Sequence, residues 1–504
     1  MPVYDQLPMT HTTRAASCTL VFIALAACGD DGPDILPAER YANQCVSPRS
    51  GTDPATDKAY LDAPGSLLDE KHWVQSWIND LYLWYREVPN PDISTFDNAV
   101  DYFAKLKTSA TTASGKPKDQ FHFTYETSYW DSLSASGVEA GYGVQWVLAA
   151  TRPPRELVVA FVQPDTPGAA AGIARGAEVL AIDGVDLVNG SDVDTLNRGI
   201  APPAAGESHS FVIRDAGAVV TRTVTLVSAD ISLAPVQRIA LDAPNDKVGY
   251  LLFTDHIATA EKGLLDEVTK LRDAGITDLV LDLRYNGGGY LAIAAELAYM
   301  IAGPNATAGK VFDREQFNDK YKTIDPITGD ALSPSPFLDQ TVGLSVPLGQ
   351  ALPHLDLKRV FVLTSAGTCS ASEAVMNGLA GVDVDVIQIG ETTCGKPYGF
   401  YPADNCGTTF FAIQFQGVNA KGFGDYADGF TPGGVFHGCT VADDFTHLLG
   451  DPAEARLAAA LAYRSGDTTC AVARRATAAA NPLAAVSGGI AVKPQWRQNS
   501  IVRR

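Results

Sequence analysis

The sequence is short of positive charge. Its 504 residues include 38 Lys and Arg against 58 Asp and Glu, which gives a formal net charge of −20. No basic patch or nucleic-acid-binding motif offsets this excess, so nucleic acid is not expected as a partner. The charge alone does not identify a substrate.

Several common site motifs are also missing. No C-x-x-C or H-x-x-x-H spacing points to zinc, and the glycine run at 287–289 lacks both the Lys-Ser/Thr of a P-loop and the G-x-G-x-x-G spacing. None of the eight His lies near a serine in an obvious triad arrangement or in a G-x-S-x-G elbow. We therefore expect no metal and no nucleotide, and a reactive group other than a histidine-activated serine.

The composition is that of a folded chain. Hydrophobic residues make up 46% of the sequence and charged residues 19%, and the length suits about three domains with sizeable cores. Apolar runs at 248–253 and 279–283 alternate with helical patterns at 262–273 and 289–301. This alternation predicts an α/β core with parallel strands and crossover helices.

The most informative stretch spans residues 360–396. An apolar run at 360–363 predicts a buried strand, residues 370–380 have helical spacing, and a second apolar strand is expected at 384–389. Ser370 would then lie where a strand turns into a helix, and the free N–H groups of the first helical turn favour a developing oxyanion there.

A serine needs a base to become a useful nucleophile. Lys396 lies 26 residues after Ser370, a separation at which the ends of adjacent βα units meet. A lysine acts as a base only when it is neutral, which requires burial that lowers its pKa. A second interpretation stays open, because Ser370-Ala371-Ser372-Glu373 also fits a capping box that merely starts a helix.

Three motifs in order resemble one known family. Residues 370–373 read SASE, residues 390–396 read GETTCGK, and residues 282–289 read DLRYNGGG. Together they are similar to the S41 carboxy-terminal processing peptidases, which are Ser-Lys enzymes, over roughly residues 67–470. Pro397 and Cys394 depart from the T-F-G-K-G loop of many members.

The resemblance implies a role for each matching residue. Ser370 would be the nucleophile, Lys396 the general base and Glu373 a supporting acidic residue. The oxyanion hole would form from the N–H of Ala371 and of a glycine, Gly288 more than Gly287. No cofactor is implied.

Residues 137–230 are β-rich and resemble a PDZ domain. The loop Gly141-Tyr142-Gly143-Val144 precedes the pattern TPGAAAGIARGAEVLAIDG. In PDZ domains such a loop presents N–H groups to a C-terminal carboxylate while the peptide adds as a strand. A plain glycine turn is the alternative for this loop considered alone.

Four further segments complete the domain plan. We expect a helical S41-like segment at 65–136 whose aromatic stripe is core, a catalytic core of the ClpP/crotonase-like type at 240–470, an insertion within it at about 302–353, and an Ala/Arg-rich tail at 471–504.

The N-terminus reads as a targeting segment. Residues 1–28 carry Arg14, a short apolar run and the ending Leu25-Ala26-Ala27-Cys28, which resembles a bacterial lipobox. Cys28 would be lipidated and residues 29–64 would be a tether. This predicts a lipid-anchored protein of the bacterial envelope that faces the periplasm, with the outer membrane favoured over the inner; plain secretory cleavage is the alternative.

Export would remove Cys18 with the leader and leave Cys28 lipidated. It makes disulfides plausible for the six cysteines after Cys28. Fifteen pairings are possible, and proximity in sequence suggests Cys394–Cys406 and Cys439–Cys470, with Cys45 and Cys369 left over.

These features predict a serine endopeptidase that acts on envelope polypeptides with accessible C-termini. The alternative is a lipid-anchored PDZ scaffold with an inactive peptidase-like core. The oligomeric state is not indicated.

Overall fold

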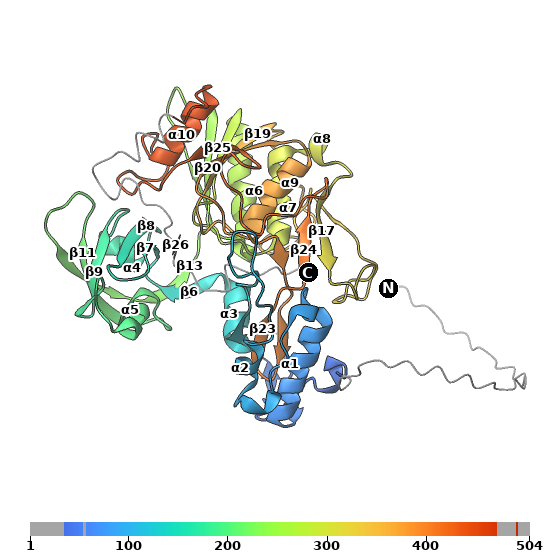
Figure 1. Cartoon of the computed structure of the whole chain (residues 1–504). Coiled ribbons are helices and arrows are strands. Elements are labelled where there is room, and N and C mark those ends of the chain that lie inside the picture. Colours follow the sequence, from blue (N-terminus) through green and yellow to red (C-terminus); the bar gives the residue numbers. More distant parts are fainter. Residues whose placement is uncertain (1–34, 54–56, 471–489, 492–504) are drawn as a thin grey trace, which may run out of the picture. The chain divides into compact units, whose positions relative to one another are not determined.

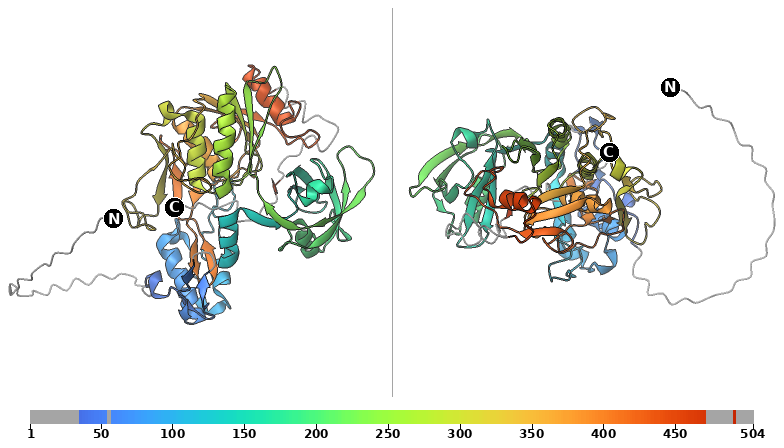
Figure 2. Two further views of the ribbon diagram at one scale, coloured as in Figure 1. Left: turned by 180° about the vertical axis from the view of Figure 1, so that it is seen from behind. Right: turned by 90° about the horizontal axis from the view of Figure 1, so that it is seen from above.

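The structure is a computed structural model that describes residues 35–53, 57–470 and 490–491. The lipobox, Cys28, residues 29–34 and 54–56 of the predicted tether and most of the tail lie outside these residues. The tether prediction is wrong for the rest of 29–64, because this stretch forms short strands and Cys45 is bridged to Cys406. All elements discussed below belong to one unit, Pro37–Arg504 (Figures 1 and 2). Within the described ranges, no helix has both the length and the apolar character needed to cross a bilayer.

The core sheet has six strands in the order β14-β15-β16-β19-β20-β25. All neighbouring pairs are parallel except β14–β15 at one edge, as the alternating pattern predicted. The strands are β14 Val236–Ile239, β15 Val248–Phe253, β16 Asp278–Asp282, β19 Arg359–Thr364, β20 Asp385–Gly390 and β25 His437–Thr440.

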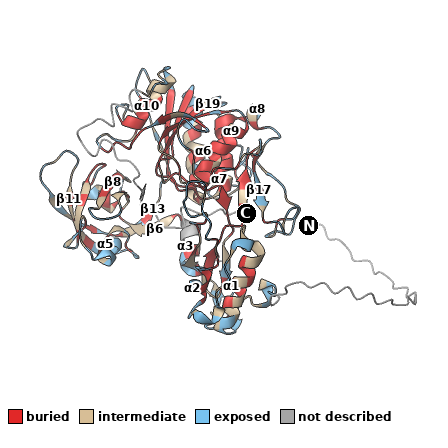
Figure 3. Cartoon of the chain, in the orientation of Figure 1, coloured by how far each residue is buried: buried red, intermediate tan, exposed pale blue. Residues whose placement is uncertain are grey.

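Both faces of this sheet are covered, which explains its nearly continuous apolar strands. One face packs against three helices through residues such as Leu281, Leu297 and Val375, and the other packs against a single helix through Leu363 and Leu457 (Figure 3). The helices are α6 Ala258–Asp273, α7 Leu291–Ala302 and α9 Ala371–Gly381 on the first face, and α10 Ala455–Arg464 on the second.

The predicted insertion contains an element that the sequence pattern did not reveal. After the short helix α8 Pro304–Thr307, strand β17 (Val311–Phe317) pairs with β18 (Ser335–Pro336) and with β24 (Phe415–Val418), and β24 also pairs with β21 (Tyr398–Gly399). Residues 408–415 are divided between two strands in two sheets. The first of these, β23 Thr408–Phe411, pairs with β22 Ala403–Asn405 and β5 Phe123–Glu126.

The N-terminal segment is helical, as expected. Its helices are α1 Leu67–Leu81, α2 Ala99–Phe103 and α3 Thr127–Ser136, with 3-10 turns η1 Ala38–Arg40, η2 Tyr85–Glu87 and η3 Ile93–Thr95. Ser66 and Asp69 form a capping box at the start of α1. Trp73, Trp77 and Phe103 are buried against Phe410 of the core, so the aromatic stripe is core.

The β-rich region folds as a PDZ-like domain. Its main sheet has the order β12-β11-β9-β8-β7-β26. The strands are β7 Val144–Ala150, β8 Glu156–Val162, β9 Glu178–Ile182, β10 Val185–Asp186, β11 Ser208–Arg214 and β12 Arg222–Val227, with helices α4 Pro167–Ala170 and α5 Val193–Ile200. A two-stranded ribbon of β6 Val138–Gly141 and β13 Ala229–Ser232 leads into and out of the domain.

The last strand of that sheet, β26 (Ile490–Ala491), comes from the predicted tail. Four further short strands lie before α1: β1 Gln44–Cys45, β2 Thr52–Asp53, β3 Lys58–Ala59 and β4 Ala63–Pro64.

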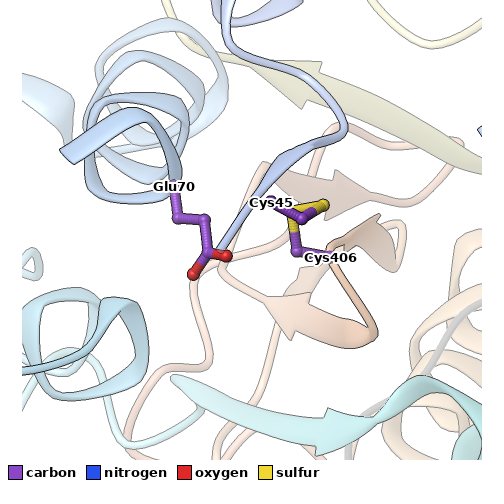
Figure 4. A group of neighbouring side chains, drawn as sticks. All are labelled: Cys45, Glu70 and Cys406. Atoms are coloured by element: carbon purple, nitrogen blue, oxygen red, sulfur yellow. A yellow bond between two sulfur atoms is a disulfide. The ribbon is translucent and has the colours of Figure 1, made fainter. Parts of the chain in front are cut away.

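The disulfides correct one of the two predicted pairs. Cys439–Cys470 is present, but Cys394 pairs with Cys369 and Cys406 pairs with Cys45. Proximity in sequence was misleading because β1 and β22 lie together in the fold although Cys45 and Cys406 are 361 residues apart. Figure 4 shows this bridge with the Glu70 side chain beside it.

Candidate active site

Three sequence motifs meet at one edge of the core sheet. The glycine loop follows β16, the Ser370 turn follows β19 and the Lys396 loop follows β20, and these strands are consecutive neighbours. Because parallel strands present their carboxyl ends at the same edge, residues far apart in sequence converge there.

Ser370 occupies a sharp turn between β19 and α9. Its φ is +55° and its ψ is −116°, a conformation that costs a non-glycine residue on the order of 1–3 kcal/mol. The side chain is buried and lies in the capping-box position toward the backbone N–H of Glu373. The hydroxyl is therefore held at a strained turn at the start of the helix.

Glu373 is the hydrogen-bonding centre of the site. One carboxylate oxygen accepts the N–H of Ser370 at 3.0 Å and that of Lys396 at 2.8 Å. The other accepts the N–H of Gly395 at 2.9 Å and the hydroxyl of Thr393 at 2.6 Å. Complete burial raises the pKa of Glu373, and these hydrogen bonds oppose the rise.

The capping-box interpretation is confirmed, because both of its bonds are present at the start of α9. Glu373 binds the N–H of Ser370, and it also binds the N–H of Lys396 in the neighbouring loop. The residue that starts the helix therefore also fixes two loops relative to each other.

Lys396 lies in an apolar setting. Its side chain is buried, with Nζ 4.2 Å from the ring centroid of Phe400 and 4.8 Å from that of Phe121. Burial lowers the pKa of Lys396 well below its ordinary value of 10.5, against the opposing charges of Asp119 and Glu373. A lysine in this environment is biased toward the neutral amine.

Ser370 and Lys396 line the same pocket. Its other walls come from α7, from β17 and from the segment after Lys396, and include Leu291, Asp313, Tyr398, Phe415 and Tyr426. The lining residues come from three separate stretches of the chain, at 291–313, 370–374 and 396–426. The pocket therefore exists only in the folded chain.

The structure places Gly288, a predicted oxyanion residue, directly beside Ser370 and Ala371. Gly288 has φ +103°, and a Cβ atom on it would lie 2.7 Å from Ser370 Cβ and 3.0 Å from Ala371 N. Only glycine fits this approach, so Gly288 and the first turn of α9 are in direct contact.

Asn286 organises the glycine loop and was not singled out from the sequence. Its Oδ1 accepts the N–H of Gly288 at 3.0 Å and lies 3.0 Å from Nδ1 of His256. Its main-chain oxygen accepts the N–H of Cys369 at 3.2 Å and the hydroxyl of Ser372 at 3.2 Å. Asn286 therefore ties the glycine loop to the turn that carries Ser370. His256 supports this loop from the side of β15.

Cys369 and Cys394 form a covalent bridge between the serine turn and the lysine loop. Cys369 directly precedes Ser370, and Cys394 lies two residues before Lys396. Both groups of potential metal ligands in the described ranges, Cys45-Glu70-Cys406 and Cys369-Glu373-Cys394, contain such a disulfide, so their sulfurs are not thiolates.

Asp119 and Phe121 are further residues that the sequence did not indicate. Asp119 is buried, accepts the hydroxyl of Tyr82 at 2.6 Å and the N–H of Phe121 at 2.9 Å, and so holds Phe121 over the lysine. No local motif marks them, because their role depends on where the N-terminal segment packs.

A buried charged network lies behind the glycine loop. Arg284, the arginine of the DLRYNGGG motif, contacts Asp282, Asp443 and Glu454. Arg175 of the PDZ-like domain reaches the same Asp443 at 2.8 Å and the hydroxyl of Tyr285 at 2.7 Å. Although burial alone would raise it, the pKa of Asp443 is held well below its usual range by these two arginines.

The PDZ loop is built partly for packing. Tyr142 is buried, and its hydroxyl donates to the carbonyl of Gly199 at 3.0 Å. Gly143 has φ +69° and lies so close to Thr166 that no side chain fits. Gly141 ends β6 and Val144 begins β7, so this loop leads directly into β7, the strand between β8 and β26.

Comparisons with known proteins agree with this arrangement. The sequence profile of Peptidase family S41 matches residues 247–400, and that of the Peptidase S41 N-terminal domain matches residues 69–125. A carboxyl-terminal-processing protease of Picosynechococcus sp. is 26% identical over 270 residues, which cover 52% of this chain and 56% of that protein. Carboxyl-terminal-processing peptidase 2 of the Arabidopsis thaliana chloroplast is 26% identical over 351 residues, which cover 68% and 58% respectively.

The fold is also found in a solved structure. A Bacteroides fragilis protein assigned to the S41 proteases superimposes with a TM-score of 0.57 at 22% identity, over 78% of this chain and 97% of that one. The chain spans a little over half the length of the curated relatives it matches. Two regions of the chain thus match models of peptidase family S41, and the chain is similar to the carboxyl-terminal processing peptidases of that family.

Proposed function

We propose that this protein is a serine peptidase that cleaves polypeptides by a Ser-Lys mechanism. The observation that carries the proposal is a strained, buried Ser370 in the same pocket as a buried Lys396 whose pKa is lowered. The match to the family model and relatives that are carboxyl-terminal-processing proteases support the reaction class.

The mechanism follows from the roles these groups can take. Ser370 Oγ attacks the scissile carbonyl while neutral Lys396 accepts its proton, and the N–H groups of Ala371 and Gly288 stabilise the oxyanion. Since the Gly288 N–H donates to Asn286 in this structure, it must exchange or share that partner when the oxyanion forms. Lys396 then protonates the leaving amine, and water releases the acyl group by the reverse route.

Endopeptidase action guided by substrate C-termini is the finer part of the proposal. It is supported by the PDZ-like domain, whose loop leads into strand β7, as in PDZ domains that bind an extended peptide by β-addition. The PDZ scaffold with an inactive core is disfavoured, because such a scaffold has no need for a strained serine and a desolvated lysine in one pocket.

The first prediction concerns the two reacting groups. Ser370→Ala and Lys396→Ala should each lower kcat by at least about a thousandfold, since nucleophile and base act as a unit. The assay is digestion of an unfolded model protein by soluble protein that lacks residues 1–28, with circular dichroism to establish that each variant is folded. Substantial cleavage by either folded variant would rule out the Ser-Lys mechanism, and cleavage absent from the parent as well would favour the scaffold.

The second prediction concerns pH. The active form has neutral Lys396, so kcat/KM should rise as pH climbs through the lowered pKa of Lys396 and level off well below pH 10.5. Lys396→Arg is the matched control because a guanidinium stays charged throughout this range, and it should be inactive at every pH. A rate that keeps rising up to the ordinary pKa of lysine would contradict the role of burial.

The third prediction concerns the bridge between the two catalytic loops. Replacing Cys369 and Cys394 by Ala should lower kcat about tenfold or more, because the serine and the lysine lose their covalent alignment. Replacing Cys439 and Cys470 is a matched control, since the two bridges close loops of 25 and 31 residues and should cost a similar amount of stability, about 3 kcal/mol.

Chemical denaturation would measure the loss of stability in each of the two double variants, and the kinetic assay would measure the loss of kcat. Equal losses of kcat in the two variants would mean that the Cys369–Cys394 bridge stabilises the fold without positioning the catalytic groups.

Lipid anchoring in the bacterial envelope is a separate part of the proposal. It is supported by the Leu25–Cys28 ending of the leader and by three disulfides among the described residues, which suit an oxidising compartment. The outer membrane is favoured over the inner, as Gly29 rather than Asp follows the cysteine.

The fourth prediction tests this anchor. In a bacterial host the parent protein should fractionate with membranes and carry lipid, and Cys28→Ser should leave it unlipidated. Mass spectrometry of the mature N-terminus is the measurement. A parent chain cleaved without lipid would instead indicate ordinary secretion.

A further inference from the structure

Strand β7 of the PDZ-like domain is paired on both of its edges. One edge of β7 pairs with β8, and the other edge takes β26, a strand formed by Ile490–Ala491 near the end of the same chain. The pairing is antiparallel and places Ile490 opposite Leu148 and Ala491 opposite Val147.

This edge is the one that an added peptide strand would need. A sheet edge exposes unpaired N–H and C=O groups that accept another strand, and PDZ domains bind extended peptides by this kind of addition. Because β8 occupies one edge of β7, only the edge that carries β26 remains for a peptide. The chain and a peptide ligand therefore compete for the same backbone groups.

The sequence around β26 suits a short added strand. Ile490-Ala491-Val492 follows two glycines, and Pro494 comes two residues later. A proline has no N–H to donate, so ladder pairing is not favoured beyond this point. The pairing that the structure describes is also internal to the chain, since residues 492–504 follow β26 in the sequence.

We propose that the segment around Ile490–Ala491 is an internal ligand of the β7 edge, which competes with the C-terminal segments of polypeptide substrates. The pairing itself stands on the described register, whereas the competition rests on the proposed function, in which substrates use this edge.

The expected strength of this competition is moderate. Covalent attachment gives the segment an effective concentration on the order of millimolar, and the start of the tail is fixed to the core by the Cys439–Cys470 bridge. A short strand without carboxylate capture binds weakly, so it would block the edge for only part of the time. Removing it should lower the apparent Kd of a peptide by about three- to tenfold.

The fifth prediction uses proline substitutions in the full mature chain. Ile490→Pro with Ala491→Pro removes two backbone donors from β26, and Ala479→Pro with Ala480→Pro is the matched control on the same tail outside β26. All variants carry Ser370→Ala so that added peptide is not cleaved.

The first readout is hydrogen exchange of β7. Amides of residues 146–148 should exchange faster in the Ile490/Ala491 variant than in the control or the parent, because their partner strand is lost. Unchanged exchange would overturn the inference, whether or not the protein proves to be a peptidase.

The second readout is binding of a fluorescent peptide with an apolar C-terminus and a free carboxylate. The Ile490/Ala491 variant should bind it about three- to tenfold more tightly than the control. Faster exchange with unchanged affinity would overturn the competition and leave β26 as a structural strand. Absence of peptide binding in every variant would overturn the competition and the capture role of β7, while hydrogen exchange would still decide the pairing.

Discussion

The hydrogen bonds of the Glu373 carboxylate are the interaction on which the arrangement of the candidate site depends. The carboxylate accepts N–H groups from Ser370, Gly395 and Lys396, so a single buried side chain sets the distance between the turn that carries Ser370 and the loop that carries Lys396. A buried carboxylate is costly unless its oxygens are satisfied, and here each oxygen has at least two donors. The same requirement makes both loops rigid, because a movement of either would leave the carboxylate short of partners.

Two other constraints act on the same pair of loops. The Cys369–Cys394 bridge links them covalently, and Asn286 links the serine turn to the glycine loop that lies against it. Together with Glu373, these residues hold the three strand ends β16, β19 and β20 in fixed relation. The positive φ of Ser370 is maintained by this surrounding network, as expected of strain at a functional site.

The lysine depends on a more distant part of the chain. Phe121, held by Asp119 on the N-terminal segment, helps to remove Lys396 from water, and burial is the main cause of its lowered pKa. The N-terminal segment thus contributes to the surroundings of Lys396 as well as to the hydrophobic core. On the other side, Arg175 of the PDZ-like domain shares Asp443 with Arg284, which joins that domain to the strand end bearing the glycine loop.

The sequence by itself determined the parallel core, the PDZ-like region and the aromatic core of α1, and the resemblance of its motifs to the S41 peptidases pointed to Ser370, Lys396, Glu373 and Gly288. These follow from local signals: apolar periodicity, turn residues and short motifs whose members are neighbours in sequence. Only the tertiary structure decided that Cys369 pairs with Cys394, that β17 lines the pocket, that Asp119 and Phe121 cover the lysine and that β26 joins β7. Each of these depends on segments tens to hundreds of residues apart, and no local pattern records which of them will meet when the chain buries its apolar surface.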